Sequence, residues 1–258
     1  MSDEGVLRRF GVVGEGEGAR AVLGAAERAG LDTVEGGARA MAGDSSVDAI
    51  AAVGEPALLS LVRHGVSAAV LPIGPVSGVG AVPTGAAERG VGSLVADEFE
   101  VVEHPVLEAS APGDARALFD LTLVTEETAR ISEYTVRSGP ATVRQFRADG
   151  VVVATPAGSP DYARAAGGPV LEAGTGTVSV VPISPFATDS DHWVLADDGV
   201  VLRVERDEAP VELLADGRAV GRVAPGENVR VQPVAAVRMV TVPEGRPPFD
   251  ERNVPTDR

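Results

Sequence analysis

The chain has 258 residues, 44% of them hydrophobic, and no cysteine, so it can form one large or two medium domains with buried cores but no disulfide, thiolate metal site or cysteine nucleophile. Its 38 acidic residues outnumber 22 basic residues that are all arginine; the missing lysine excludes P-loop and Schiff-base mechanisms, and the net charge of −16 argues against non-specific nucleic-acid binding. Every apolar run is shorter than the roughly 18 residues of a membrane span and the N-terminus lacks the apolar core of a signal peptide, so we expect a soluble cytoplasmic protein.

Residues 1–93 alternate apolar runs with helical segments. The expected strands are 6–13, 47–53 and 67–73, and the expected helices are 19–30 and 57–65. Such alternation predicts a small α/β domain with a parallel sheet and helices on its faces. The glycine-rich turn 14–18 follows the first strand, but Glu15 and Glu17 within it would repel a pyrophosphate. We therefore interpret it as a flexible turn rather than as a dinucleotide-binding fingerprint.

Residues 94–243 show a different pattern, in which Gly, Pro, Asp or Asn separates most of a series of short runs with partial alternation. We expect strands at 98–110, 117–127, 131–139, 141–149, 150–156, 177–185, 199–207, 210–218 and 228–234. This spacing predicts an antiparallel β-rich domain, a sandwich or a barrel, and we expect a β-sandwich-like one, interrupted by one helical piece at 161–168. Residues 244–258 form a polar, Pro-rich tail. The predicted fold class is therefore α/β plus all-β, with one domain of each kind.

The acidic, lysine-free composition has two explanations. A dense carboxylate surface stays hydrated at high salt, where counterions screen its self-repulsion, so the composition is typical of a salt-adapted protein. A GC-biased genome that favours arginine codons explains the missing lysine equally well. The acidity favours adaptation to high salt, because codon bias alone does not require it.

One segment, residues 149–169, carries a motif that is specific by length and order. An Asp-Gly pair is followed by a strand, a turn that reads Thr-Pro-Ala-Gly-Ser-Pro-Asp-Tyr, and a closing Gly-Gly-Pro. This segment resembles the NAD kinase family, whose turn reads Thr-Pro-Thr-Gly-Ser-Thr-Ala-Tyr. Weaker likenesses to the same family are found, in chain order, at Ala117–Asp120, at Val178–Val181 with the following Pro-Ile-Ser-Pro, at Asp216-Gly217-Arg218 and at Pro225-Gly226-Glu227.

The resemblance implies a fold of the kind expected above, an α/β domain followed by a β-rich domain, assembled as a homo-oligomer. It also implies a reaction, the transfer of a phosphoryl group from ATP to the 2′-hydroxyl of the adenosine ribose of NAD, which gives NADP. Mg²⁺ or another divalent cation would accompany ATP, and NAD(H) and NADP(H) would be the other ligands. The histidines show no spacing typical of metal ligands, so we expect no metal site formed by histidine.

The phosphate-binding signature of the family, Gly-Gly-Asp-Gly-Thr, corresponds to residues 53–57, Val-Gly-Glu-Pro-Ala. Gly54 is kept, and Glu55 keeps a carboxylate with one more methylene, so the resemblance assigns Glu55 the role of catalytic base. A displacement of about 1 Å in a reacting group can cost on the order of a hundredfold in rate. Pro56 removes an N–H donor and Ala57 lacks a hydroxyl, so phosphate binding should suffer more than base chemistry. The alternative for Glu55 is a surface residue that begins a helix.

The resemblance assigns the remaining site residues to the dinucleotide. Phe119 replaces an asparagine and can stack on a base, whereas Asp120 keeps the neighbouring acid. The other nucleotide-binding candidates are Gly54, Asp149, Thr155, Gly158, Ser159, Asp161 and Tyr162. Structural alternatives remain for several of them: a strand-edge carboxylate at Asp120, a tight turn with a helix cap at Gly158 and Ser159, and a core aromatic at Tyr162.

Three functions are compatible with these residues. The first is a divergent NAD kinase of weakened activity, which the motif at residues 149–169 favours. The second is a catalytically impaired paralogue that binds NAD(P) and regulates a partner, which the changes at 54–57 favour. The third is a related kinase acting on another hydroxyl, because Phe119, Pro160 and Asp161 alter the acceptor side.

Overall fold

The structure is a computed structural model that describes residues 7–110, 115–127, 130–187, 191–207 and 209–246. The chain divides into two compact units. The first comprises Met1–Glu103 and Val237–Arg258, and the second comprises His104–Ala236. The first unit is therefore built from two separate stretches of sequence, and the division follows Glu103 instead of the expected residue 93.

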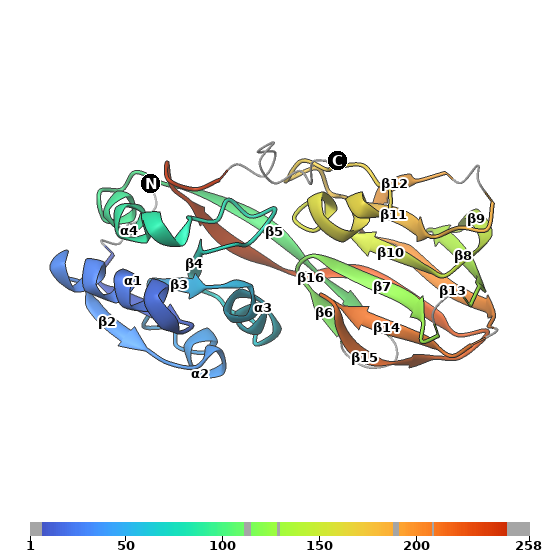
Figure 1. The fold of residues 1–258 in the computed structure, drawn as a ribbon, viewed down its shortest axis with the longest axis horizontal. Helices are drawn as coiled ribbons and strands as arrows, with labels where there is room; N and C mark the ends of the chain where they lie inside the picture. Colours follow the sequence, from blue (N-terminus) through green and yellow to red (C-terminus); the bar gives the residue numbers. More distant parts are fainter. Residues whose placement is uncertain (1–6, 111–114, 128–129, 188–190, 208, 247–258) are drawn as a thin grey trace. The chain divides into compact units, whose positions relative to one another are not determined.

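The first unit contains a parallel sheet in the order β2-β1-β3-β4 (Figure 1). Its strands are β1(Arg9–Val13), β2(Asp32–Glu35), β3(Ala49–Val53) and β4(Ala69–Ile73). Its helices are α1(Gly16–Arg28), α2(Ala38–Ala42), α3(Glu55–Arg63), the 3₁₀ turn η1(Thr84–Ala86) and α4(Ala87–Val95). The far end of β16(Asn228–Thr241) joins this sheet, where Met239 pairs with Val70.

Successive side chains of β1 point to opposite faces of this sheet, and helices cover both faces. Phe10 and Val12 are buried in a cluster that includes residues of α1 and α4. Gly11 faces the other way, where an added Cβ would lie 2.7 Å from the sulfur of Met41 in α2. Because both faces are covered, β1, β3 and β4 are largely hydrophobic, as strands of parallel sheets usually are.

The second unit contains two antiparallel sheets. One sheet has the order β12-β11-β10-β7-β14-β15, and the other contains β16-β13-β8-β9 with β5 and β6 at its side. The bounds are β5(Glu100–Ala109), β6(Ala115–Ala117), β7(Asp120–Thr125), β8(Ser132–Ser138), β9(Ala141–Ala148), β10(Gly150–Ala154), β11(Thr177–Ile183), β12(Trp193–Ala196), β13(Val200–Arg206), β14(Val211–Ala215) and β15(Arg218–Val223). Inward side chains of both sheets form one core, as expected for a sandwich.

Strand β10 is buried on both of its faces. Val151 and Val153 belong to the core between the sheets. Val152 and Ala154 face outward and are covered by Ala163 of a short π-helical turn, η2(Ser159–Ala163). This cover explains the uninterrupted hydrophobic run of the strand. It also fixes the chain that follows β10 against the outer face of the sheet.

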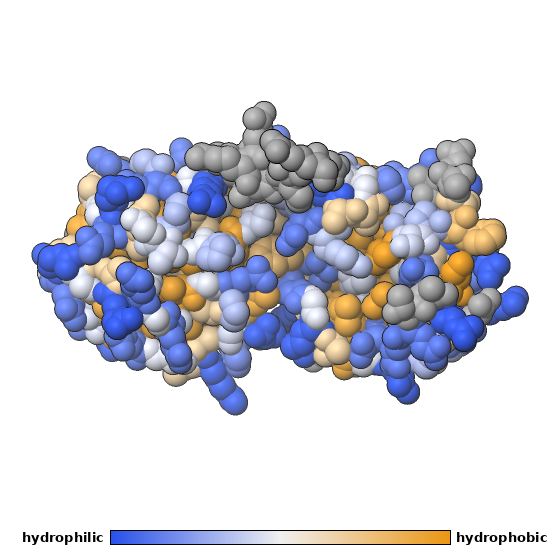
Figure 2. All heavy atoms as spheres, in the orientation of Figure 1, coloured by the Kyte–Doolittle hydropathy of each residue, from blue (hydrophilic) through white to orange (hydrophobic). Residues whose placement is uncertain are grey.

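The architecture confirms the predicted fold class, a parallel α/β region and an antiparallel β-rich region. The predicted helix at 161–168 is wrong in detail, because the helical turn begins at Ser159, is π-helical and is broken by non-helical dihedral angles at Asp161. Figure 2 shows hydrophilic residues spread over much of the visible face of both units. Among the described residues, no helix is long and apolar enough to cross a membrane.

Candidate functional site

Two turns of the second unit are joined by hydrogen bonds. One turn, residues 118–120, leads into β7, and the other, residues 155–159, leaves β10. The Thr155 hydroxyl donates to the carbonyl of Leu118 at 2.6 Å, and the Thr155 N–H donates to the carbonyl of Phe119 at 2.9 Å. Thr155 is fully buried, so these bonds are shielded from water. The first turn thus cannot move without the second.

Gly158 is required where the two turns touch. A Cβ at this position would clash with the carbonyl oxygen of Phe119. The next residue, Ser159, is fully buried; its hydroxyl donates to the carbonyl of Pro156 at 2.9 Å and accepts the N–H of Leu171 at 2.8 Å. For Gly158 and Ser159, the sequence favoured a tight turn with a helix cap together with a ligand contact, and the observed bonds of Ser159 are those of a turn.

The carboxylate of Asp216 also holds the first turn, through backbone N–H groups. It accepts the backbone N–H groups of Leu118 at 3.1 Å, Phe119 at 2.7 Å and Asp120 at 3.3 Å. In return, the Asp216 N–H donates to the carbonyl of Asp120 at 3.0 Å. Asp216 itself has φ of 48°, a conformation that Asp tolerates better than most residues. A carboxylate that accepts several N–H groups forms strong, charge-assisted bonds, so this turn is held rigidly.

Asp120 lies in a crowded, partly desolvated acidic environment. Its pKa is raised to about 6, mainly by burial and also by repulsion from Asp216 and Asp161, while the hydrogen bond from Thr122 opposes this rise. The Thr122 hydroxyl donates to Asp120 Oδ1 at 2.8 Å. Tyr162 is 44% exposed, and burial followed by the charges of Asp120 and Asp149 raises its pKa. The exposure of Tyr162 contradicts its alternative as a core aromatic.

The structure therefore gathers most of the predicted residues of the second unit around two bonded turns and their surroundings. They are Phe119, Asp120, Thr155, Gly158, Ser159, Asp161 and Tyr162. Asp149 lies at the opposite end of β10, where its carbonyl accepts the Thr125 N–H at 3.0 Å, and it is linked to this group only through the effect of its charge on the pKa of Tyr162.

Gly54 and Glu55 belong to the first unit. Gly54 has φ of 85°, a conformation that favours glycine, and its N–H donates to the carbonyl of Ile73 at 2.8 Å. It is the N-cap residue of α3, so Glu55 and Pro56 form the exposed first turn of that helix. A helix N-terminus favours negative charge, but Pro56 contributes no N–H donor to it.

Sequence reasoning did not assign a role to Asp216 or Thr122. In the sequence, Asp216 was noted only as part of an Asp-Gly turn. Its hydrogen bond with Phe119 could not be predicted, because the two residues lie far apart in the sequence. Within the described part of the chain, no group of three or more His, Cys, Asp or Glu side chains is arranged to hold a metal ion.

Residues 119–240 match the family described as ATP-NAD kinase C-terminal domain. The NAD kinase of Thermomicrobium roseum is 30% identical over 205 residues, which are 76% of this chain and 71% of that protein. The NAD kinase of Symbiobacterium thermophilum is 32% identical over 175 residues, covering 65% of this chain and 62% of that protein. An NAD kinase from Archaeoglobus fulgidus in complex with ATP has a TM-score of 0.74 at 20% identity, covering 96% of both chains. Yeast NADH kinase complexed with NADH has a TM-score of 0.75 at 14% identity, covering 93% of this chain and 85% of that chain.

Proposed function

Because the chain belongs to the NAD kinase family, we propose that it phosphorylates the 2′-hydroxyl of the adenosine ribose of NAD with ATP, giving NADP. One observation supports this proposal most directly: the turn 118–120 is clamped between Asp216 and Thr155. Such rigidity is what a binding turn needs, since a ligand then meets groups that are already oriented. The family match includes this turn from residue 119 onward.

The clamped turn supplies the acceptor side of the proposed site. Phe119 offers an aromatic ring on which a flat ring of the dinucleotide can stack. Asp120, when ionised, accepts hydrogen bonds from a sugar hydroxyl or a carboxamide of the ligand. Tyr162 adds a second half-exposed ring beside these acids. Asp161 would repel a phosphate, so we expect a neutral part of the ligand to lie next to it.

Glu55 supplies the base in the proposed reaction. Its carboxylate takes the proton of the 2′-hydroxyl while the ribose oxygen forms a bond to the γ-phosphorus of ATP. The bond from that phosphorus to the bridging oxygen breaks, and ADP leaves with the electron pair. A divalent cation would enter as part of the substrate, bound to the ATP phosphates. Gly54 lets the phosphates approach the backbone, whereas Pro56 weakens this contact because it has no N–H.

A second candidate is a regulatory protein that binds NAD(P) without turnover. Pro56 favours it, because this residue lies in the helical turn where phosphate-binding N–H groups are needed. Both candidates bind NAD through the same acceptor-side residues, and only the first transfers a phosphoryl group.

A coupled assay of NADP formation separates the candidates. The purified chain is incubated with Mg-ATP and NAD in molar KCl, beside Glu55→Ala and a control, Glu27→Gln, on the exposed face of α1. We expect turnover by the wild type and the control, and loss of turnover in Glu55→Ala. If the wild type binds NAD but none of the three proteins forms NADP, the result would instead support the regulatory candidate.

A further inference from the structure

Strand β5 has a free edge in the first unit. Figure 1 shows β5 beside β16, and the strand pairs with β16 and with β6. The pairing with β6 is limited to Leu107–Ala109. Because a strand has two edges, the stretch Glu100–Glu103 has no partner strand on one of them among the described residues. An unpaired edge presents a row of backbone N–H and C=O groups, so this stretch can accept one further strand.

Apolar side chains are exposed at this edge and directly before it. Val101 is 45% exposed, and Phe99, the residue before β5, is 36% exposed. Phe99 also lines a cavity of about 580 Å³, whose other walls include Glu100, Val242 and Pro243. Exposed apolar side chains that lie together, rimmed by polar residues, are typical of an interaction surface. An extended segment paired with the free edge would cover them.

Carboxylates surround these apolar side chains. Asp97, Glu98 and Glu100 line the cavity, which has no basic lining residue, and Glu103 follows along the free edge. All four carboxylates are exposed, and within the described part of the chain none of them forms an ion pair. Positive side chains on a bound segment would offset their mutual repulsion. The surface is therefore complementary to a basic segment.

The order of residues along the edge selects one kind of occupant. From Glu100 to Glu103 it reads Glu-Val-Val-Glu. Side chains directly opposite each other in paired strands interact, and like charges in opposite positions are destabilising. A second copy of this chain, paired antiparallel, would place Glu100 opposite Glu103, so the edge disfavours self-association. A segment that reads Arg-Val-Val-Arg instead places a cation opposite each glutamate and an apolar side chain opposite each valine, in either direction.

We propose that the edge Glu100–Glu103 binds an extended segment of a partner protein, which adds to β5 as a further strand and carries Arg or Lys opposite Glu100 and Glu103. The surface shares no residue with those assigned above to NAD or to phosphoryl transfer, so the inference does not rest on the proposed function. In strand addition, backbone hydrogen bonds supply affinity and side chains supply specificity. High salt screens long-range charge, but ion pairs at contact distance remain.

Capped peptides test this surface on the full chain in molar KCl. The probe is Thr-Arg-Val-Val-Arg-Thr, and the acidic control is Thr-Glu-Val-Val-Glu-Thr. A third peptide is the probe with both valine nitrogens methylated, which removes the central N–H donors and keeps the charges and apolar side chains. Backbone amide NMR signals of the isotope-labelled chain report the affinity and the residues that respond. Glu100→Arg reverses a charge of the edge, and Glu27→Arg makes the same change on the exposed face of α1 as the matched control.

We expect the probe to bind the wild type and Glu27→Arg equally and to shift the amide signals of Glu100–Glu103 most. Glu100→Arg should weaken binding of the probe by roughly fivefold or more, and the acidic peptide should bind the wild type more weakly by a similar factor. The methylated peptide should not bind. Equal binding of the three peptides by the wild type, or no shifts at Glu100–Glu103, would overturn the inference without recourse to a variant. Shifts of the same amides on dilution of the chain alone would also overturn it, because a second copy would then occupy the edge.

Discussion

The carboxylate of Asp216 accepts the backbone N–H of Phe119 at 2.7 Å, across 97 positions of sequence. With the adjacent bonds from Leu118 and Asp120, it fixes the turn that carries the aromatic and acidic residues of the proposed acceptor side. Asp216 therefore acts through the turn, as a positioning residue.

Replacing Asp216 should weaken both stability and NAD binding. Asp216→Ala leaves the N–H groups of Leu118 and Phe119 without this acceptor, which should cost about 3 kcal/mol of unfolding free energy and more than tenfold in NAD affinity. Asp216→Asn keeps one acceptor oxygen and should cost less in both measurements. Asp198→Ala, at an exposed Asp-Gly turn of the same unit, is the control and should change stability by less than about 0.5 kcal/mol. Equal behaviour of Asp216→Ala and Asp198→Ala in chemical unfolding would contradict the clamp.

Gly158 should tolerate no side chain. A methyl group there meets the carbonyl of Phe119, so Gly158→Ala should lower the unfolding free energy by about 2 kcal/mol and separate the two turns. In contrast, Gly92 lies in α4 and an added Cβ meets no atom within 4 Å. Gly92→Ala should be neutral or stabilising by up to about 1 kcal/mol. Thermal melting of both variants checks this pair, and a neutral Gly158→Ala would show that the turns are not in contact.

Asp120 should make stability depend on pH. Its pKa is about 6 in the folded protein against 3.8 for the model carboxyl, so the folded state binds more protons between these values. The unfolding free energy should therefore fall as pH rises from about 4 to 6, by up to roughly 3 kcal/mol from this residue. Asp120→Asn removes the titration and keeps an acceptor for Thr122. Its stability relative to wild type should rise over this pH range, and a constant difference would contradict the raised pKa.

The same titration should affect ligand binding in the opposite direction. A ligand hydroxyl or amide donates to the ionised Asp120, which predominates above pH 6. NAD affinity should rise between pH 5 and 7 in the wild type and stay flat in Asp120→Asn. Titration calorimetry at several pH values measures this, and parallel pH profiles would show that Asp120 does not meet the ligand.

Much of the fold could be predicted from the sequence, because burial determines the spacing of hydrophobic residues along each helix or strand. The run Gly150–Ala154 predicts β10 since both faces of that strand are covered. Helix α4 was missed because Gly90 and Gly92 interrupt its apolar pattern. Strand β2 was missed because this short edge strand has no fully buried residue. The predicted run 228–234 was too short, since β16 continues to Thr241 in the other unit.

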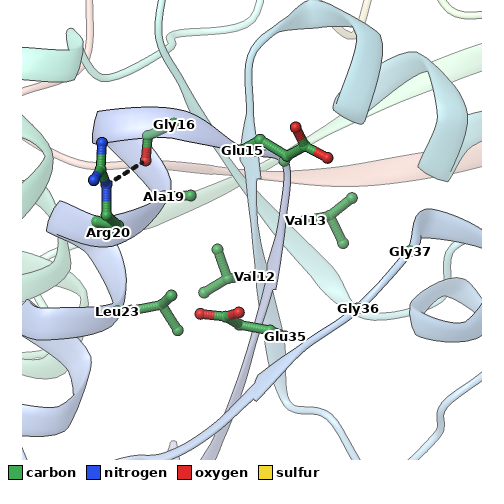
Figure 3. A pocket seen from close by; sticks show the side chains of 11 residues that line it. Val12, Val13, Glu15, Gly16, Ala19, Arg20, Leu23, Glu35, Gly36 and Gly37 are labelled. Carbon is green, nitrogen blue, oxygen red and sulfur yellow. Dashed lines mark hydrogen bonds between the residues drawn. The ribbon is translucent and has the colours of Figure 1, made fainter.

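The site was less predictable for a physical reason. Motif residues such as Thr155 and Gly158 mark a turn, but the sequence does not show which distant carbonyls they meet. Asp216 acts on backbone groups of residues 118–120, and backbone groups carry no sequence signal. Likewise, the cavity of the first unit that is lined by Val12, Leu23 and Glu35 (Figure 3) depends on the pairing of β1 with β2, which places Glu35 opposite Val12.

The acidic composition leads to a prediction about salt. With a net charge of −16, self-repulsion should destabilise the folded chain at low ionic strength. The melting temperature should rise by several degrees between 0.1 M and 2 M KCl. A chloride salt is preferable to sulfate, which strengthens apolar burial in any protein. An unchanged melting temperature would contradict salt adaptation and favour codon bias as the cause of the missing lysine.

The most direct test of the central claim is the rate of NADP formation from NAD and Mg-ATP in molar KCl, for the wild type and Glu55→Ala. The account predicts measurable turnover by the wild type and a loss of at least a hundredfold in Glu55→Ala, with NAD affinity unchanged because Glu55 does not belong to the clamped turn. Equal turnover by both proteins would contradict the role of Glu55, and no turnover by either, alongside tight NAD binding, would contradict kinase activity.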